Sequence, residues 1–363
     1  MAMSGGVDSS VAAALLLRQG YEVVGAFMRL GTPDGVEAPD ACDSSGKRGC
    51  CSVRDAHDAR AVAGLLGIPF YVLNFQEDFG RVIDYFVQEY NVGRTPNPCI
   101  RCNDWLKFGK LTQYAKAIGA EFVASGHYAR SVPDPSTGQR LLLRGKDLHK
   151  DQSYVLFGIT SENLQHTLFP VGELEKPEVR AIAEELKLPV FDKPDSQEIC
   201  FVPDDDYAAL LQRRSPSTFR PGEFVSTAGE ILGTHPGHQH FTVGQRKGLR
   251  IALGARAYVL EINAETNRVT LGEKSDLLKH NLSATQVNMV HPRLHALEPG
   301  QCLPCQVKVR YNQQPQPASL TLAGDGAMQV RFDQAQSAIT PGQAAVAYDN
   351  EVLLCGGWID KAW

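Results

Sequence analysis

The stretch Ala2-Met3-Ser4-Gly5-Gly6-Val7-Asp8-Ser9-Ser10 decides the fold, because it separates a short apolar start from a helix-patterned segment, 11–19, that stops at Gly20. Glycines let a backbone approach an oxyanion closely, successive N–H groups point into such a turn, and the following helix adds positive potential at its N-terminal end. The lysine of a Walker loop is missing, so the turn is not the usual NTPase cradle. The sequence predicts a phosphate-binding turn between a strand and a helix.

Strand and helix patterns alternate from this turn to about residue 188. We expect strands at 22–29, 70–75 and 121–125, and helices at 53–66, 79–90, 106–118 and 177–188. Such alternation indicates a parallel sheet covered by helices. Ligands of these sheets bind at the carboxyl ends of the strands, which is where the turn would lie. The first strand has almost no residues before Ser4, which is shorter than this fold prefers.

Beyond Pro221 the pattern changes to short strands separated by Gly, Pro and Asn. We expect them at 223–226, 257–262, 268–271, 305–310, 319–322, 329–332, 344–348 and 352–355. This texture is typical of β-barrels. The sequence therefore predicts an α/β protein with an N-terminal parallel-sheet domain over 1–204, a small, mostly-β central domain over 205–275 and a C-terminal β-barrel domain over 276–363.

Composition sets wider limits. The 363 residues are 43% hydrophobic and 21% charged, which is typical of a globular protein with two or three domains. No apolar run approaches the roughly 20 residues that span a bilayer, and no secretory leader is visible. We expect a cytoplasmic protein with no membrane partner. Nine cysteines in that compartment favour catalytic, metal-binding or core thiols over a disulfide framework.

The charge distribution points to a phosphate-rich partner. The net charge of -5 argues against a uniformly basic nucleic-acid binder. Three basic segments nevertheless contain no acidic residue, namely 105–120, 231–260 and 299–324. One such segment is most simply a solvated face, but three in a mildly acidic chain make a nucleic acid a serious candidate.

Two cysteine segments carry chemical signals. Two prolines stiffen the approach to the C-x-x-C of Cys99 and Cys102, which precedes a predicted helix, and thiols near a helix N-terminus have lowered pKa values. Cys200 lies in a polar stretch between the region of alternating strands and helices and the region of short strands. A lone cysteine is more often a small, buried, hydrophobic residue. We interpret the pairs Cys302/Cys305 and Cys50/Cys51 as structural.

Nine motifs in order carry a resemblance to a known family. SGGVDSS resembles the PP-loop of ATP pyrophosphatases, which cleave ATP between the α and β phosphates and transfer AMP to a substrate oxygen. With the other eight, the chain resembles the tRNA-specific 2-thiouridylases over nearly its whole length. These eight are Cys50-Cys51-Ser52 before Asp55, Asp58-Ala59-Arg60, GRTPNPCIRCN from Gly93, Lys107-Phe108, SGHYAR from Ser125, KDQSYVL from Lys150, DSQEICF from Asp195 and GQRKGL from Gly244.

The resemblance implies an activity and its partners. An adenine nucleotide α-hydrolase-like first domain would bind ATP and Mg²⁺, and the C2 oxygen of the wobble uridine in tRNAs for Lys, Glu and Gln would be adenylated. A sulfur-donor protein, a cysteine desulfurase or a relay, would supply a persulfide carried on Cys200. Cys102 would be the nucleophile that releases the sulfur by forming a transient disulfide with Cys200. The products would be 2-thiouridine, AMP and pyrophosphate, and the central domain would bind tRNA.

The resemblance also implies three sets of site residues. ATP would contact Ala2, Met3, Ser4, Gly5, Gly6, Val7, Asp8, Ser9, Met28 and Gly126. The target base would be flanked by Asn97, Pro98 and Cys99. The tRNA would contact His127, Lys150, Asp151, Gln152, Arg310, Tyr311 and Gln343; without the family, each of these would be taken for a solvated surface residue.

Alternatives remain at this stage. Some family members have Asp where this chain has Cys99, so Cys99, Cys102 and Cys200 could instead hold an iron–sulfur cluster or zinc, as in other PP-loop thiolases. We favour the persulfide and expect no protein-bound metal site. An amidotransferase-type PP-loop synthetase would not need the paired cysteines, and a non-enzymatic tRNA-binding module would leave the PP-loop idle.

Overall fold

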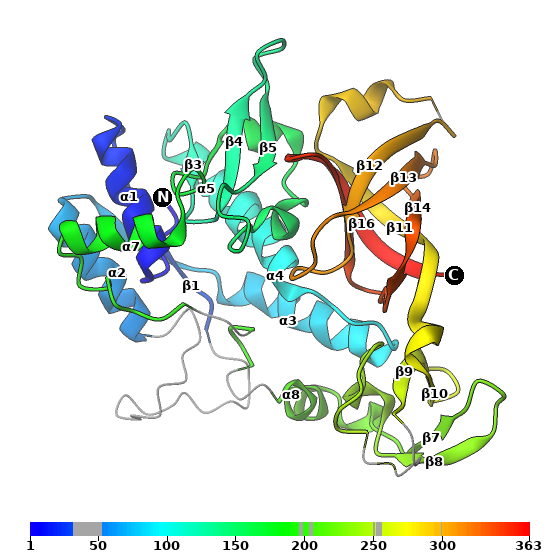
Figure 1. Cartoon of the computed structure of the whole chain (residues 1–363). Coiled ribbons are helices and arrows are strands. Elements are labelled where there is room, and N and C mark those ends of the chain that lie inside the picture. The colour runs from blue at the N-terminus through cyan, green and yellow to red at the C-terminus, as the bar shows by residue number, and fades with distance from the viewer. Residues whose placement is uncertain (32–52, 196–198, 203–205, 250, 252–255, 299) are drawn as a thin grey trace. The chain divides into compact units, whose positions relative to one another are not determined.

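The computed structural model describes residues 1–31, 53–195, 199–202, 206–249, 251, 256–298 and 300–363 (Figure 1). The pair Cys50/Cys51 lies outside the described residues. The chain divides into two compact units. The first comprises Met1–Val82, Cys99–Asp205 and Glu351–Leu353, and the second comprises Ile83–Pro98, Asp206–Asn350 and Leu354–Trp363.

The first unit is built on a parallel sheet whose central strand is the short N-terminal segment. β1 (Gly25–Arg29) pairs in parallel with β2 (Phe70–Asn74), and β3 (Val123–Ala124) pairs in parallel with β6 (Thr167–Leu168). Ala2 forms a parallel bridge with Ala26 and donates its N–H to the carbonyl of Ala124 at 2.8 Å. Three residues before Ser4 are therefore enough to join the two halves of the sheet, and the turn leaves from the middle of it.

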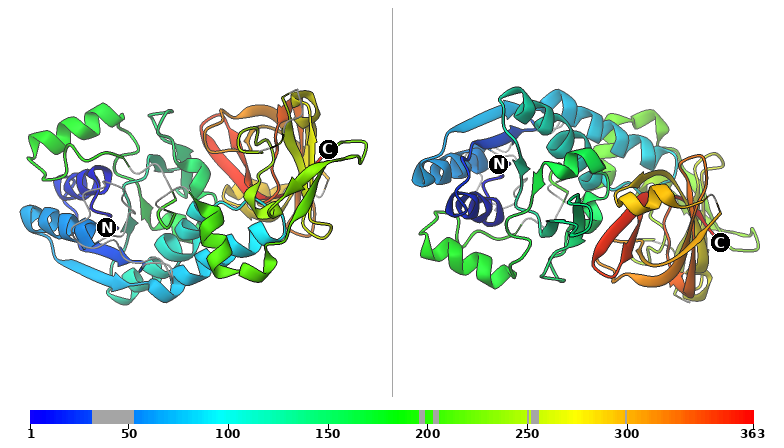
Figure 2. Two further views of the ribbon diagram at one scale, coloured as in Figure 1. Left: turned by 90° about the horizontal axis from the view of Figure 1, so that it is seen from below. Right: turned by 90° about the horizontal axis from the view of Figure 1, so that it is seen from above.

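Three helices pack together beside this sheet. They are α1 (Val7–Arg18), α2 (Val53–Leu66) and α7 (Lys176–Glu185), which lie side by side in both views of Figure 2. Small and branched side chains such as Val11, Ala12, Val62, Val179 and Ala183 are completely buried between them. Each buried valine contributes on the order of 1.5–3 kcal/mol. α1 begins four residues before the predicted start, because Val7–Ser10 are already helical.

A longer helical region follows. α3 (Gln76–Asn91) is followed by α4 (Pro98–Arg101), a π-helix η1 (Cys102–Lys110) and α5 (Leu111–Ala117), which run on without a break. The predicted helix at 106–118 thus starts earlier, and the C-x-x-C lies within its first turns rather than ahead of it. The hairpin of β4 (Ala129–Pro133) and β5 (Arg140–Arg144) was not expected from the sequence. The 3-10 turn η2 (Ser153–Leu156) and α6 (Ser161–Gln165) complete this part.

The second unit is mostly β, as predicted. After α8 (Tyr207–Arg214) and the 3-10 turn η3 (Pro216–Thr218), a four-stranded sheet has the order β8 (Ile231–His235), β7 (Gly222–Val225), β10 (Arg268–Gly272) and β9 (Tyr258–Asn263). The 3-10 turn η4 (His238–His240) follows β8, and Phe224, Val259 and Val269 belong to the buried core of this sheet.

The C-terminal strands form a closed six-stranded barrel. Their order is β11 (Leu278–Met289), β14 (Met328–Ser337), β13 (Gln316–Leu322), β12 (Cys302–Lys308), β15 (Ala344–Asp349) and β16 (Val352–Ala362), and pairing of β11 with β16 closes the ring. The 3-10 turns η5 (Lys274–Leu277) and η6 (Pro292–Ala296) flank β11. The predicted fold class, a parallel-sheet domain followed by β-barrel structure, is confirmed; the three-domain boundaries stay a prediction.

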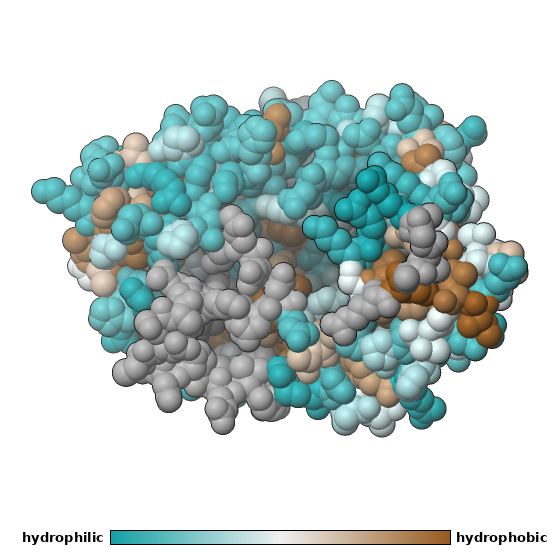
Figure 3. Space-filling view, turned by 60° about the horizontal axis from the view of Figure 1, so that its bottom comes forward, coloured by the Kyte–Doolittle hydropathy of each residue, from teal (hydrophilic) through white to brown (hydrophobic). Residues whose placement is uncertain are grey.

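The described surface in Figure 3 is largely hydrophilic, with small hydrophobic areas between the polar ones. Among the described residues, no helix has both the length and the apolar character needed to cross a membrane.

Candidate active site

The phosphate turn is fixed by its own hydroxyl groups. Gly5 has a φ of +72°, and a Cβ at this position would collide with the backbone carbonyl of Asp55. The Ser9 and Ser10 hydroxyls donate to the carbonyl of Gly6 at 3.2 and 2.8 Å. The N–H of Ser4 donates to the Ser9 hydroxyl at 3.2 Å. The shape of the turn is therefore held by contacts within the chain itself.

The other predicted nucleotide residues lie at the same edge of the sheet. Gly126 follows β3, and a Cβ there would lie 2.6 Å from the backbone nitrogen of Ser9. Met28 lies near the carboxyl end of β1, on the other side of the central strand. Because parallel strands end at one edge, residues more than a hundred positions apart meet at the turn.

Asp8 is the charged residue of the turn, and it binds two side chains that the sequence did not single out. Its carboxylate accepts hydrogen bonds from Tyr128 Oη at 2.8 Å and from Lys176 Nζ at 2.7 Å. Burial and the neighbouring Asp8 raise the pKa of Tyr128. The phenol therefore stays protonated and remains a donor.

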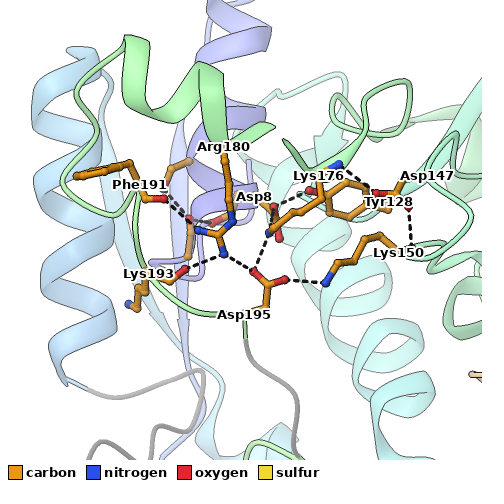
Figure 4. A network of polar contacts seen from close by, with 12 residues as sticks. Asp8, Tyr128, Asp147, Lys150, Lys176, Arg180, Phe191, Lys193 and Asp195 are labelled. Atoms are coloured by element: carbon orange, nitrogen blue, oxygen red, sulfur yellow. Dashed lines mark hydrogen bonds and ion pairs between the residues drawn. The ribbon is translucent and has the colours of Figure 1, made fainter. Parts of the chain in front are cut away.

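Asp195, five residues before Cys200, gathers three cations (Figure 4). Its carboxylate lies 2.8 Å from the Nζ atoms of Lys150 and Lys176 and 3.2 Å from the guanidinium of Arg180. Burial acts to raise the pKa of Asp195, but the hydrogen bonds from Lys150 and Lys176 outweigh it and hold the pKa below its ordinary value. Asp195 is thus a carboxylate at neutral pH.

Lys193 ties the turn to α2. Its Nζ donates to the carbonyl of Gly5 at 2.8 Å and to the carboxylates of Asp55 and Asp58, both at 2.7 Å. The side chains of Lys193 and Asp55 are only 12% and 6% exposed. Removing one partner of such a buried ion pair costs about 3–5 kcal/mol, because the other charge is left uncompensated.

The helix that carries the C-x-x-C has an unusual geometry. Cys99 is exposed and Cys102, the first residue of η1, is half-buried. π-helical segments are rare in proteins, and those that occur often lie at functional sites. The Trp105 ring has the guanidinium groups of Arg81 and Arg101 5.2 and 5.1 Å from its centre. These contacts hold the Trp105 side chain in place, one turn of the helix after Cys102.

Asp104 lies two residues beyond Cys102 on the same helix. Burial raises the pKa of this carboxyl group, and Arg101 at 3.7 Å opposes the shift. Asn103, next to it, donates its side-chain amide to the carbonyl of Val155 at 2.9 Å.

The segments of Cys102 and Cys200 both pack against the first turns of α3. Lys110, at the end of η1, forms an ion pair with Asp78 at 2.7 Å, and Arg81 lies over Trp105. Phe201, which follows Cys200, makes an edge-to-face contact with Phe79, with 5.6 Å between ring centres. Cys102 and Cys200 are about a hundred residues apart in the sequence. The segments that carry them nevertheless pack against the same helix, α3.

Four predicted tRNA residues of the first unit hold internal contacts. Asp151 is buried, and its carboxylate binds Arg144 at 3.1 Å and two backbone N–H groups. His127 is also buried, with Nδ1 2.7 Å from the Ser125 hydroxyl, and burial together with Lys107 lowers its pKa well below the usual value. Gln152 accepts the N–H of Tyr128, and Lys150 is half-exposed beside Asp195. Their contact with tRNA stays a prediction, and only Lys150 offers an accessible cation.

In the second unit, Gln343 supports the chain that leads to the predicted target-base residues. Its amide donates to the carbonyls of Thr95 and Pro96 at 3.0 and 3.1 Å. The N–H of Thr95 donates to the carbonyl of Pro341 at 2.9 Å. Asn97 and Pro98 follow directly, so Gln343 acts on their position whether or not it touches tRNA.

Arg310 and Tyr311, also in the second unit, are exposed on the segment that follows β12. The Arg310 guanidinium donates to the carbonyl of Ala338 at 2.5 Å, and the Lys308 ammonium lies 5.9 Å from the centre of the Tyr311 ring. Lys308 itself is buried, and the contact of the exposed Arg310 and Tyr311 with tRNA stays a prediction.

The residues that sequence reasoning missed are Tyr128, Lys176, Lys193 and Asp195 in their site roles. Tyr128 and Asp195 lie inside quoted motifs, so the motifs could have suggested them. Lys176 lies in no motif. Its only signal is its place just before Pro177, where a helix was predicted to open.

Comparison with known proteins identifies the family. Residues 1–204 match the model described as "tRNA methyl transferase HUP domain", 209–273 match "tRNA methyl transferase PRC-barrel domain", and 279–359 match "Aminomethyltransferase beta-barrel domain". The relative from Rhodopirellula baltica named tRNA-specific 2-thiouridylase MnmA is 47% identical across 100% of this chain and 96% of its own length. The chain belongs to the MnmA family.

Other MnmA family members are as similar. The Clostridioides difficile 2-thiouridylase is 47% identical over 99% of this chain and 97% of its own, and that of Carboxydothermus hydrogenoformans is 48% identical over 99% and 97%. Among solved structures, the U34-tRNA thiolase NcsA from Methanococcus maripaludis with its [4Fe-4S] cluster aligns with a TM-score of 0.34 at 19% identity. It covers 60% of this chain and 66% of that one, which is too weak a likeness to support an argument.

Proposed function

We propose that the protein is an ATP-dependent tRNA-uridine 2-sulfurtransferase. The C2 oxygen of the wobble uridine attacks the α-phosphorus of ATP, the bond from that phosphorus to the bridging oxygen of the β-phosphate breaks, and pyrophosphate leaves with the electron pair. The uridine then carries AMP on an oxygen that has become a good leaving group. The observation that carries the proposal is the edge-of-sheet turn of Ser4, Gly5 and Asp8, closed by Gly126, in a chain of the MnmA family.

Cys102 and Cys200 carry out the transfer of sulfur to the base. The terminal sulfur of a persulfide on Cys200 attacks C2 and expels AMP, which leaves the base joined to Cys200 through a disulfide. The Cys102 thiolate attacks the Cys200 sulfur, so 2-thiouridine is released and a Cys102–Cys200 disulfide remains for a thiol reductant. The packing of both segments on α3 supports this pairing.

The residues at the turn suit Mg²⁺ bound together with ATP. Mg²⁺ usually takes one or two carboxylates and completes its shell with phosphate oxygens and water. Asp8 supplies one such carboxylate and its side chain is 30% exposed. A bound Mg²⁺ would neutralise phosphate charge. Asp8 would orient it, while the N–H groups of the turn hold the α-phosphate.

An iron–sulfur cluster fits these residues less well. Among the described residues, no group of three or more His, Cys, Asp or Glu side chains is arranged to hold a metal ion, and Cys99, Cys102 and Cys200 are all described. We therefore route the sulfur through Cys200 and derive no step through a cluster. Cys99 flanks the target base in this proposal.

The partners follow from the reaction. The tRNAs are those for Lys, Glu and Gln, and the sulfur arrives from a persulfide-bearing protein, a desulfurase or a relay. We place the enzyme in the cytoplasm because the reaction needs reduced thiols and tRNA, both of which are found there.

The test is a product assay. The protein is incubated with ATP, a small-molecule persulfide and unmodified tRNA, and AMP, pyrophosphate and 2-thiouridine are measured together. Equal amounts of all three support the proposal. A synthetase would form AMP without 2-thiouridine, and a binding module would form none of them, so either result would refute it.

A further inference from the structure

One ammonium group joins the phosphate turn to the segment that leads to Cys200. Lys176 Nζ lies 2.7 Å from Asp8 Oδ1 and 2.8 Å from Asp195 Oδ1, and Figure 4 shows it between the two carboxylates. Its side chain is 10% exposed, and the ammonium lies 5.7 Å from the centre of the Tyr128 ring. A charge so far withdrawn from water interacts strongly with its partners.

The backbone around Lys176 fixes where this ammonium points. Lys176 is the first residue of α7, and its N–H donates to Asp147 Oδ2 at 3.0 Å. The capping interactions of Glu175 and Glu178 hold the same helix end. α7 in turn packs along α1, the helix that begins at the turn.

The charges of the cluster allow Lys176 to change partners. Lys150, Lys176 and Arg180 face Asp8 and Asp195, and the carboxylate of Asp147 accepts the backbone N–H groups of Lys150 and Lys176, so the cluster holds three cations and three carboxylates. Asp195 keeps Lys150 and Arg180 when Lys176 turns to another ligand, and Asp8 keeps the hydrogen bond from Tyr128 and can bind the Mg²⁺ that accompanies ATP. The ammonium can thus exchange its bond to Asp195 for one to a phosphate oxygen without leaving Asp195 uncompensated.

We propose that Lys176 binds the pyrophosphate end of ATP and takes the place of the lysine that the turn lacks, with Asp195 as its positioning residue. This inference rests on the proposed function. Negative charge grows on the bridging oxygen as its bond to the α-phosphorus breaks, and an ammonium beside the leaving pyrophosphate stabilises that charge. Among the described residues, two ammonium groups contact the turn: Lys193 is bound by the Gly5 carbonyl, Asp55 and Asp58, whereas Lys176 contacts the Asp8 side chain.

The experiment separates a phosphate ligand from a structural ion pair by product inhibition. Wild type, Lys176→Gln, Lys176→Arg and Asp195→Asn are assayed for adenylation of tRNA with inorganic pyrophosphate or AMP as the inhibitor. Lys146→Gln is the matched control, because Lys146 is a half-exposed lysine that pairs with Glu178 on the same helix at 3.7 Å.

For Lys176→Gln we expect inhibition by pyrophosphate to weaken about 10- to 100-fold, as for loss of one charged hydrogen bond, while inhibition by AMP is unchanged. The KM for ATP should rise with it and the adenylation rate should fall. Lys176→Arg should restore part of the pyrophosphate binding, and Asp195→Asn should weaken it less than Lys176→Gln does. Lys146→Gln should behave like wild type.

Two outcomes would overturn the inference. Either pyrophosphate inhibits Lys176→Gln as strongly as wild type, or AMP and pyrophosphate binding fall together, as a distorted turn would cause. If Lys176→Gln does not fold, the comparison of Lys176→Arg with Asp195→Asn decides, since loss of pyrophosphate binding without loss of AMP binding is required of at least one. Wild type that forms no AMP and pyrophosphate would refute the proposed function instead, so the two failures are distinct.

Discussion

The predicted phosphate turn and the barrel surface around Arg310 differ in how their residues are held. At the turn, Gly5, Gly126 and Asp8 are fixed by close backbone approach and by side chains from distant segments. Arg310 and Tyr311 instead stand exposed at a strand end. The first arrangement is suited to chemistry and the second to affinity that depends on salt. Substitutions in the two regions should therefore separate adenylation from tRNA binding.

The largest effect is expected from Asp8→Ala. It removes the carboxylate that orders Tyr128 and Lys176, so AMP and pyrophosphate formation should fall below detection while tRNA affinity stays nearly unchanged. Glu185→Ala, which removes an exposed ion pair with Arg18 worth roughly 0–1 kcal/mol, is the matched control. Full adenylation by Asp8→Ala would contradict the assignment of the turn.

The cysteine variants should lose thiolation and keep adenylation. Cys200→Ser should lose both persulfide loading and 2-thiouridine, and Cys102→Ser should lose 2-thiouridine while Cys200 still loads. Cys99→Ser should keep partial activity, and Cys302→Ser, an exposed barrel cysteine, should match wild type. Adduct mass and product assays on the same samples report both steps.

A cluster mechanism would give another pattern. Substitution of Cys99, Cys102 or Cys200 would then be about equally damaging, because a site with three thiolate ligands does not easily tolerate loss of one. Metal-free protein supplied with persulfide, with sulfide excluded, decides between them. Thiolation that appears only after iron is restored would overturn the persulfide route.

Arg310→Ala tests the other side of the comparison with a moderate effect. Loss of one phosphate contact should weaken all substrate tRNAs similarly and flatten the salt dependence of log Kd by a slope of roughly 0.7 to 0.9. Adenylation at saturating tRNA should not change. Affinity that does not respond to salt in wild type would refute the electrostatic account.

The smallest effect concerns stability of the second unit in acid. Burial, with the nearby His238 and His240, lowers the pKa of His235 to about 4, so this ring is neutral in the folded protein at neutral pH. In the unfolded chain a histidine has a pKa of about 6.5, so below this pH the unfolded state binds more protons than the folded state. The contribution of the neutral ring to folding stability is therefore complete above pH 6.5 and is lost as the pH falls toward 4. The melting temperature should fall over this window less steeply in His235→Gln than in wild type; parallel curves would contradict the assignment.

How much the sequence predicted differs between the regions for physical reasons. The turn and the barrel strands follow local rules of glycine geometry and alternation, and they were predicted from the sequence; Gly126 was implied only by the family resemblance. Lys176 and Lys193 could not be predicted, because their roles depend on which helices pack beside the turn. The β4–β5 hairpin was missed because Leu141, Leu142 and Leu143 lack the alternation of a typical half-buried strand.

Asp151 and His127 show where the family resemblance and the structure differ. The resemblance implies that both residues contact tRNA, but in the structure their side chains contact Arg144 and Ser125. Arg310 and Tyr311 also make contacts within the protein, with Ala338 and Lys308, but both residues are exposed. The position of a side chain therefore decides how directly it can meet tRNA.

The central claim is that the C2 oxygen of uridine is adenylated, and isotope transfer tests it most directly. Substrate tRNA labelled with ¹⁸O at C2 of the wobble uridine is converted in a single turnover with ATP and persulfide, and the AMP is analysed by mass spectrometry. The account predicts that each 2-thiouridine formed leaves one ¹⁸O on the phosphate of AMP. Formation of 2-thiouridine with AMP free of the label would contradict it.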